Sequence, residues 1–319
     1  MTRSRAAEPR RPAGASAPAI RVEAPAKVNL YLHLLGRRAD GLHELDSLIA
    51  FAGVGDSLAV EAAPAGCLTL TIDGPFADRL APAGNSDTDD NLVLRAARLL
   101  AEACGGGDRF GAKIRLTKRL PVAAGLGGGS ADAAAALRAL ERLWGVDPGP
   151  ERRQAITRAL GADVPVCLAG RPAFVGGIGE RLAPVPPLPQ AHLVLVNPGV
   201  PLPTAAVFGA RTGAFSEPAR FDEAPSGAAA LARLLAARRN DLTRPALNLA
   251  PAVGAVLAAL GEAPGCLLAR MSGSGATCFG LFAEAAAAAA AARAIAAARP
   301  GWWVRPAPLL AHDGGGQGK

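Results

Sequence analysis

The feature that most constrains this chain's fold is a run of glycines between an alternating strand pattern and an alanine-rich helix. The stretch reads "RLPVAAGLGGGSADAAAALRAL" over residues 119–140. The first N–H groups of a helix lack intrahelical partners and carry the positive end of its dipole, so a loop without side chains suits an anion there. The pattern predicts a phosphate-binding loop followed by a helix over residues 130–144. A tight glycine turn capped by Ser130 is the alternative.

The spacing excludes the two commonest phosphate loops. No lysine follows the glycines as a P-loop requires. The dinucleotide-binding fingerprint G-x-G-x-x-G/A requires glycine or alanine at its last position. Here that position is Ser130 when counted from Gly125 and Asp132 when counted from Gly127. A phosphate-binding role therefore requires a third kind of loop.

Composition excludes several classes of protein. The 319 residues suit one large or two medium domains. An arginine-rich segment over residues 1–22 carries most of the net charge of +7, and aromatic residues make up only 4%, so we expect no nucleic-acid partner. Prolines interrupt the longest uncharged stretch, residues 182–210, which excludes a membrane helix. Five cysteines without paired spacing indicate reduced thiols in a cytoplasmic protein.

Hydrophobic periodicity predicts strands and helices in neighbouring groups, without strict strand–helix alternation, which favours the α+β class. The expected strands are 19–38, 51–63, 67–73, 112–120 and 191–199, with a strand–turn–strand unit over 266–282. The expected helices are 87–105, 130–144, 151–161, 227–240, 250–262 and a surface helix over 284–299. The proline-rich connector 183–190 divides the chain into domains 22–182 and 183–310, between a disordered tail (1–21) and a flexible tail (311–319).

Four segments together resemble the GHMP kinase superfamily and, within it, the 4-diphosphocytidyl-2-C-methyl-D-erythritol kinases. They are "APAKVNLYLHLLGRRADGLHEL" (24–45), "LPVAAGLGGGSADAA" (120–134), "LGADVPV" (160–166) and "MSGSGATCF" (271–279). The resemblance implies a two-domain fold, with an N-terminal domain like ribosomal protein S5 domain 2 and a ferredoxin-like C-terminal domain. It places ATP between the domains.

The resemblance implies that ATP, with Mg2+ on its phosphates, phosphorylates the 2-hydroxyl of a methylerythritol unit carried on cytidine diphosphate. No residue is assigned as a metal ligand. We expect small-molecule partners only, no membrane, and a monomer or weak homodimer. The alternatives are another GHMP alcohol kinase, which "RADGLHEL" disfavours, and a non-catalytic nucleotide-binding module, which would be expected to lose Lys27 and Asp163.

Two residues carry the chemistry that the resemblance implies. Asp163 matches the family's catalytic aspartate, which accepts the proton of the attacking hydroxyl; a helix cap before Val-Pro is the alternative. Lys27 matches the active-site lysine, which stabilises charge on the transferring group. A lysine in an apolar strand needs a partner. Asn29 lies two residues on, points to the same face, and is expected to orient the substrate hydroxyl or the aspartate.

The resemblance places the phosphates of ATP over the glycine loop and the adenine near residues 90–92. Asp90 and Leu92 lie beside that adenine contact, although helix capping explains Asp90 and Asn91 almost as well. Ser272–Thr277 is expected to form a second anion-binding turn. The ATP-binding residues so assigned are Asn91, Pro121, Val122, Ala123, Ala124, Gly125, Leu126, Gly127, Gly128, Gly129, Ser130 and Ala131.

On the acceptor side, His43 matches the histidine that hydrogen-bonds the cytosine edge, with an exposed loop histidine as the alternative. Thr204 and Phe208 match residues near the cytidine, although a core role for the phenylalanine is nearly as well supported. The chain departs from the family at Leu42, where an aromatic residue is common and would stack on the base.

Overall fold

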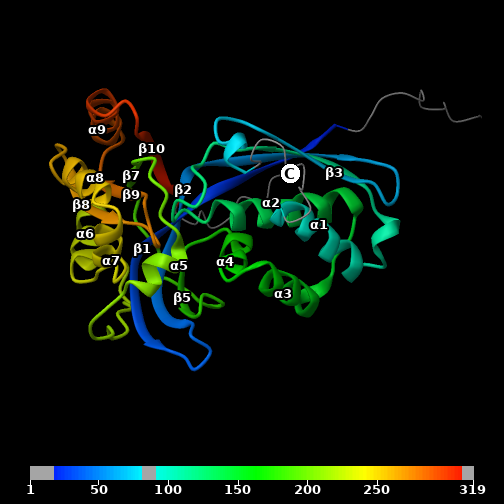
Figure 1. The fold of residues 1–319 in the computed structure, drawn as a ribbon, viewed down its shortest axis with the longest axis horizontal. Helices are drawn as coiled ribbons and strands as arrows, with labels where there is room; N and C mark the ends of the chain where they lie inside the picture. The colour runs from blue at the N-terminus through cyan, green and yellow to red at the C-terminus, as the bar shows by residue number, and fades with distance from the viewer. Residues whose placement is uncertain (1–17, 81–90, 311–319) are drawn as a thin grey trace, which may run out of the picture.

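The computed structural model describes residues 18–80 and 91–310, which form a mixed sheet with helices on both sides (Figure 1). The strands follow the order β3-β4-β2-β10-β7-β9-β8, with β1 and β5 also paired to β2, and β6 to β5. The α+β class is therefore confirmed. Asp90, the tail over residues 1–17 and the tail over residues 311–319 lie outside the described residues.

The strands are β1 (Ile20–Arg37), β2 (His43–Ala62), β3 (Leu68–Asp73), β4 (Ala112–Thr117), β5 (Ala173–Gly177), β6 (Arg181–Ala183), β7 (His192–Asn197), β8 (Cys266–Met271), β9 (Cys278–Phe282) and β10 (Trp303–Leu310). The helices are α1 (Leu92–Ala103), α2 (Gly128–Trp144), α3 (Gly149–Leu160), α4 (Val164–Ala169), α5 (Thr204–Gly209), α6 (Ala228–Ala236), α7 (Thr243–Leu249), α8 (Ala252–Gly261) and α9 (Ala285–Ala298). In the described ranges, no helix combines the length and apolarity needed to cross a bilayer.

A long hairpin of β1 and β2 runs between the two groups of helices (Figure 1). Its strands pair antiparallel from Ile20 opposite Val60 to Arg37 opposite His43. The centre of β1 is buried on both faces, because α2 covers one side and the strands of the C-terminal half contribute to the core on the other. Lys27 and Asn29, the candidate site residues of β1, are therefore buried in the middle of the molecule.

Helix α2 packs tightly because its buried face consists largely of alanine. Ala133–Ala136 are fully buried between α1, α4 and the β1–β2 hairpin, and the small side chains let these elements approach closely. The helix begins at Gly128, with Gly127 as the N-cap in the left-handed region at φ 61°. Ser130 therefore lies inside the first turn, so the alternative that Ser130 caps this helix is wrong.

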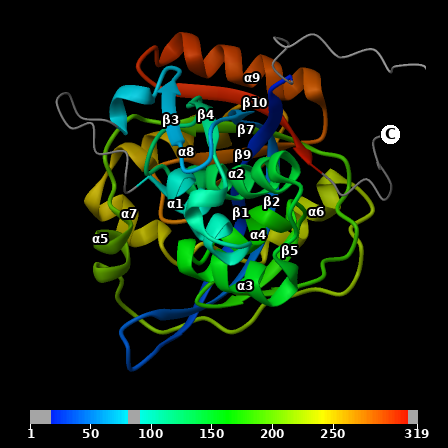
Figure 2. The ribbon, with the colours of Figure 1, turned by 90° about the vertical axis from the view of Figure 1, so that its right-hand side faces the viewer.

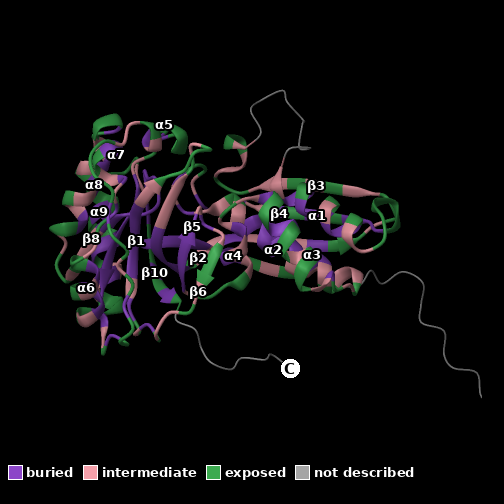
Figure 3. Ribbon diagram, turned by 90° about the horizontal axis from the view of Figure 1, so that it is seen from below, coloured by how far each residue is buried: buried purple, intermediate pink, exposed green. Residues whose placement is uncertain are grey.

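The last strand, β10, joins the two halves of the sheet. Residues 303–308 pair with β7, while Leu309 and Leu310 pair with β2. Helix α9 lies over β10 and β7 (Figure 2), and it buries Ala288, Ala291, Ala292 and Ile295. The helix expected at the surface over residues 284–299 therefore has one buried face. In Figure 3, the buried strands lie between helices whose outer faces are exposed.

Candidate active site

Lys27 and Asp163 meet in a cavity at the centre of the molecule. Lys27 comes from the middle of β1, and its Nζ lies 3.1 Å from Asp163 Oδ2. The lysine side chain is 5% exposed and the aspartate side chain 36% exposed, so the carboxylate faces the cavity while the ammonium is covered. Asp163 occupies the N-cap position of α4 but makes no capping hydrogen bond with its side chain. Its side chain therefore pairs with Lys27 instead of capping the helix.

Asn29 extends this pair into a buried hydrogen-bonded network. Lys27 Nζ donates to Asn29 Oδ1 at 2.9 Å, and Asn29 Nδ2 donates to Ser47 Oγ at 2.8 Å. The backbone N–H of Asn29 donates to Ser272 Oγ at 3.1 Å. Two acceptors, one from Asn29 and one from Asp163, thus hold the lysine ammonium in a fixed position.

The glycine loop and the turn at 272–277 pack directly against each other. Ser272 Oγ donates to the Gly125 carbonyl at 2.9 Å, and the Thr277 N–H donates to the Ala124 carbonyl at 3.2 Å. Gly125 has φ 74°, and a Cβ there would overlap the Ser272 carbonyl oxygen. Only glycine permits this approach. The two turns therefore form one wall of the cavity, although they are far apart in the sequence.

Nine of the eleven loop residues assigned to ATP line the cavities around the loop. The side chains of the other two, Leu126 and Ala131, are buried in the hydrophobic core. The Leu126 carbonyl accepts a hydrogen bond from the Lys27 N–H at 2.9 Å, which ties the loop to β1. Ser130 and Asp163 line the same central cavity.

Asn91 caps α1 and also lines a cavity beside the glycine loop. Its Oδ1 accepts from the Val93 N–H at 2.9 Å. It lines a cavity of about 320 Å³ together with Leu92, Val122 and Gly129. The capping role that the sequence analysis left open is therefore present, and the position beside the loop is compatible with a second role there.

A buried charge cluster, which the sequence analysis missed, lies beneath the glycine loop. Lys118 Nζ lies 2.5 Å from Asp56 Oδ2 and 2.7 Å from Asp132 Oδ2, and all three side chains are buried. Asp56 Oδ1 also accepts from the Leu120 N–H at 2.9 Å. The cluster joins β2, the end of β4 and the start of α2. The available signal was an acid, Asp132, within a run of alanines.

Burial and mutual attraction oppose each other in this cluster. Burial alone would lower the pKa of Lys118, but the charges of Asp132 and Asp56 outweigh it and raise that pKa. Burial raises the pKa of Asp132 to about 7, against the opposing effect of Lys118. Asp132 Oδ1 has no hydrogen-bond partner among the described residues. Asp132 therefore titrates near neutral pH.

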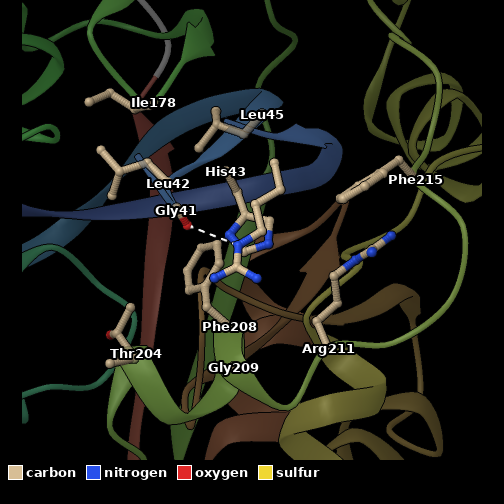
Figure 4. Close-up of a pocket in the computed structure, with 12 residues that line it drawn as sticks. Gly41, Leu42, His43, Leu45, Ile178, Thr204, Phe208, Gly209, Arg211 and Phe215 are labelled. Atoms are coloured by element: carbon tan, nitrogen blue, oxygen red, sulfur yellow. Dashed lines mark hydrogen bonds between the residues drawn. The ribbon is translucent and has the colours of Figure 1, made fainter. Parts of the chain in front are cut away.

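His43, Thr204 and Phe208 meet in a second cavity of about 850 Å³ (Figure 4). The rings of His43 and Phe208 are 5.2 Å apart between centroids, and Phe215 lies on the other side of His43 at 6.3 Å. Leu42 is 48% exposed and lines this cavity beside His43, where the family aromatic residue would stand. The structure therefore brings the three predicted residues together.

His43 is held in its neutral form by its surroundings. Burial lowers its pKa, and the positive charges of Arg37 and Arg211 lower it further. A neutral imidazole has one donor and one acceptor nitrogen. His43 can therefore make complementary hydrogen bonds with a base that offers both an amino group and a ring nitrogen.

The central cavity, of about 440 Å³, adjoins both the Asn91 cavity and the His43 cavity. It shares Leu92, Ala123, Gly128 and Gly129 with the Asn91 cavity, and Leu45, Ile178, Thr204 and Phe208 with the His43 cavity. Lys27 and Asp163 also line this central cavity. The arrangement suits two substrates that meet at the pair, one from each adjoining cavity.

Comparison with known proteins identifies this arrangement. The family described as "GHMP kinases N terminal domain" matches residues 91–171, and "GHMP kinases C terminal" matches residues 223–300. The 4-diphosphocytidyl-2-C-methyl-D-erythritol kinase of Paramagnetospirillum magneticum is 59% identical over 290 residues, which cover 91% of this chain and 98% of that protein. The chain belongs to this kinase family.

Solved structures agree with the assignment of the kinase. A crystal structure of 4-(cytidine 5'-diphospho)-2C-methyl-D-erythritol kinase is 37% identical and has a TM-score of 0.73, covering 91% of this chain and 99% of that one. A homoserine kinase from Cytophaga hutchinsonii has a TM-score of 0.65 at 19% identity, covering 93% and 96% of the two chains, and shows the shared fold alone. The two-domain GHMP kinase fold is thereby confirmed.

Proposed function

We propose that this kinase transfers the γ-phosphate of ATP to the 2-hydroxyl of 4-diphosphocytidyl-2-C-methyl-D-erythritol. The observation that carries the proposal is the Lys27–Asp163 pair, which lines one cavity with the glycine loop, and this cavity adjoins the His43 cavity. The closely related kinases, whose names specify this acceptor, support the substrate. Another GHMP alcohol kinase remains the competing function within the same fold.

In this mechanism Asp163 is the general base. The acceptor hydroxyl donates its proton to the Asp163 carboxylate as its oxygen attacks the γ-phosphorus, and ADP leaves with the electrons of the broken phosphorus–oxygen bond. Lys27, 3.1 Å from the carboxylate, lies where it can stabilise negative charge on the transferring phosphoryl group. Asn29 fixes the lysine through its Oδ1. Positioning and electrostatics thus supply the catalysis.

The backbone of residues 121–131 is proposed to bind the phosphates of ATP, with the turn at 272–277 as a second contact. Gly127, Gly128 and Gly129, at the start of α2, line the cavity, and the absence of side chains there lets an anion approach the backbone closely. Asn91 and Leu92 border the cavity proposed for the adenine.

Mg2+ fits this site as an ion carried on the triphosphate. Among the described residues no group of three His, Cys, Asp or Glu side chains could hold a metal, but Mg2+ on a nucleotide needs only one or two protein oxygens. The Ser130 hydroxyl, in the first turn of α2, is the side chain that would hold it. When bound, the ion neutralises charge on the phosphate oxygens.

The proposal also covers the cellular compartment and the oligomeric state of the enzyme. All five cysteines are free, which supports a reducing compartment such as the cytoplasm. Large exposed apolar side chains lie on separate segments, for example Leu182, Leu249 and Leu267, which supports a monomer or weak homodimer.

The test is to measure ADP formation from ATP with a panel of acceptor alcohols. We expect turnover with the cytidine diphosphate-linked methylerythritol, and none above background with homoserine or mevalonate. Turnover with one of those alcohols but not with the cytidine compound would favour another GHMP kinase activity. ATP binding without turnover on any acceptor would favour the non-catalytic alternative.

A further inference from the structure

Two arginines line the His43 cavity without a carboxylate partner among the described residues. Arg37 Nε donates only to the Gly41 carbonyl, at 3.3 Å. Arg211 donates to the carbonyl oxygens of Gly213, at 2.9 Å, and Ala214. The Arg211 guanidinium carbon lies 4.1 Å from the ring centroid of Phe215. Both side chains are oriented by neutral groups, so their charges are not neutralised by protein.

The cavity itself is positively charged. No Asp or Glu is among the described residues that line it. Neighbouring arginines that do not line it are paired: Arg38 lies 2.9 Å from Asp40, and Arg239 lies 2.6 Å from Asp241. The charges on Arg37 and Arg211 therefore persist where a ligand would bind.

We propose that Arg37 and Arg211 form a binding site for the diphosphate of the acceptor, an inference that rests on the proposed function. Guanidinium groups present several donors in a planar fork that matches phosphate oxygens. Stacking on Phe215 and bonds to carbonyl oxygens restrict the Arg211 side chain before a ligand arrives. Less side-chain entropy is then lost on binding.

This site is separate from the one proposed for the phosphates of ATP. Neither arginine lines the central cavity that contains the glycine loop. Thr204 and Phe208 belong to both cavities and form part of the wall between them. One anion site thus serves each substrate, and the arginine site favours an acceptor that carries phosphate over an uncharged alcohol.

The proposal can be tested by calorimetry on the full chain, with the ATP site filled by a non-hydrolysable ATP analogue. The probes are cytidine, CMP, CDP and inorganic pyrophosphate. The variants are Arg37→Gln, Arg211→Gln and the double variant. Arg38→Gln is the matched control, because Arg38 lies next to Arg37 but pairs with Asp40 outside the cavity.

We expect CDP to bind the wild-type protein more tightly than CMP, and CMP more tightly than cytidine. Each substitution should weaken CDP binding on the order of tenfold, as for a charge-assisted hydrogen bond, and leave cytidine binding unchanged. Raising the salt concentration should weaken CDP binding in the wild type more than in the double variant. Arg38→Gln should bind all four probes like the wild type.

Unchanged CDP affinity in the double variant would overturn the inference. An equal loss for cytidine and CDP would also overturn it, because the arginines would then shape the cavity without contacting the diphosphate. Binding of pyrophosphate distinguishes a failure of this inference from a failure of the proposed function. Pyrophosphate binding that requires both arginines supports the anion site even where cytidine does not bind, whereas no binding of any probe overturns both.

Discussion

The position of Asp163 shows how a single side chain is diverted from a local capping role to an ion pair with a distant residue. An aspartate before Val-Pro suits a helix N-cap, and Asp163 occupies that position in α4. The nearby Lys27 ammonium, however, offers a charged partner at 3.1 Å, and the carboxylate makes no capping bond. An N-cap contributes only about 1 kcal/mol, so a partner for a buried lysine outweighs it.

Replacing Asp163 with Asn tests the role of the base. The amide keeps nearly the same shape but cannot accept the proton, so kcat should fall about 10²–10⁴-fold while the KM for ATP changes little. Steady-state kinetics with varied ATP measure both. Asp222→Asn, at an exposed position, is the control and should retain wild-type kinetics. A fall of less than about tenfold would show that positioning alone carries the rate.

Leu42 is where this chain departs from its family, and its exposed side chain borders the His43 cavity. Stacking of a base on an aromatic ring contributes about 1–3 kcal/mol, and leucine covers a base less well. Leu42→Tyr should therefore lower the KM for the cytidine substrate severalfold and leave the KM for ATP unchanged. No change in a folded variant would indicate that another ring, such as Phe215, already covers the base.

At the scale of elements, the glycine loop packs closely against Lys27. Gly127 has φ 61°, and a Cβ there would lie 2.8 Å from Lys27 Cε. A side chain at this position would therefore displace Lys27 as well as crowd the proposed phosphate contact.

Gly127→Ala should consequently lower kcat as well as raise the KM for ATP. The fold should remain, since the left-handed conformation costs a non-glycine residue only about 1–3 kcal/mol. Kinetics and thermal unfolding together test this. Gly107→Ala is the control, because a Cβ there meets nothing within 4 Å. A variant with normal kcat and only a raised KM for ATP would show that Lys27 is not disturbed.

The cluster of Asp56, Lys118 and Asp132 predicts a pH dependence of stability. Burial raises the pKa of Asp132 to about 7, so the folded protein retains a proton that the unfolded chain loses near pH 4. The stabilising contribution of protonated Asp132 to the free energy of unfolding is complete below about pH 4 and is lost as the pH rises through about 7. Asp132→Asn removes this titration.

Urea unfolding at pH 5 and pH 8 measures the effect. The wild type should be more stable relative to Asp132→Asn at pH 5 than at pH 8. Asp222→Asn, at an exposed position, should show no such difference. The same stability difference at both pH values would contradict the titration of Asp132.

At the scale of the whole molecule, β10 connects the two halves of the sheet through β7 and β2. Val304, Ala307 and Leu309 on this strand are buried. The predicted division into 22–182 and 183–310 remains a prediction, but the last strand of the second segment completes the sheet of the first.

Truncation after residue 302 should therefore abolish cooperative unfolding of the chain as one unit. The edges of β2 and β7 would lose their shared partner, and the buried side chains of β10 would leave two cores open. Circular dichroism during urea titration measures this. Arg305→Ala, exposed on the same strand, should stay within about 0.5 kcal/mol of the wild type. A cooperative transition at the wild-type midpoint in the truncated chain would refute the joining role.

Local patterns in the sequence predicted the glycine loop and most helices and strands, because periodicity and turn residues are properties of neighbouring positions. The resemblance to the GHMP kinases supplied Lys27, Asp163, His43, Thr204 and Phe208 as candidate site residues. Local patterns missed β10, whose Pro306 and Pro308 weaken a strand pattern. They also missed the short strands β5 and β6 and the short helices α4, α5 and α7, which are too short for a clear period.

Only the tertiary structure decided which distant residues meet. Ser272 lies against Gly125, Lys118 lies between Asp56 and Asp132, and Arg37 shares a cavity with Arg211. Serines, lysines and arginines are common on any surface, so nothing in their local sequence marks them. Their roles follow from pairings across the sheet, because burial and close approach, which set charge and geometry at a site, depend on the whole fold.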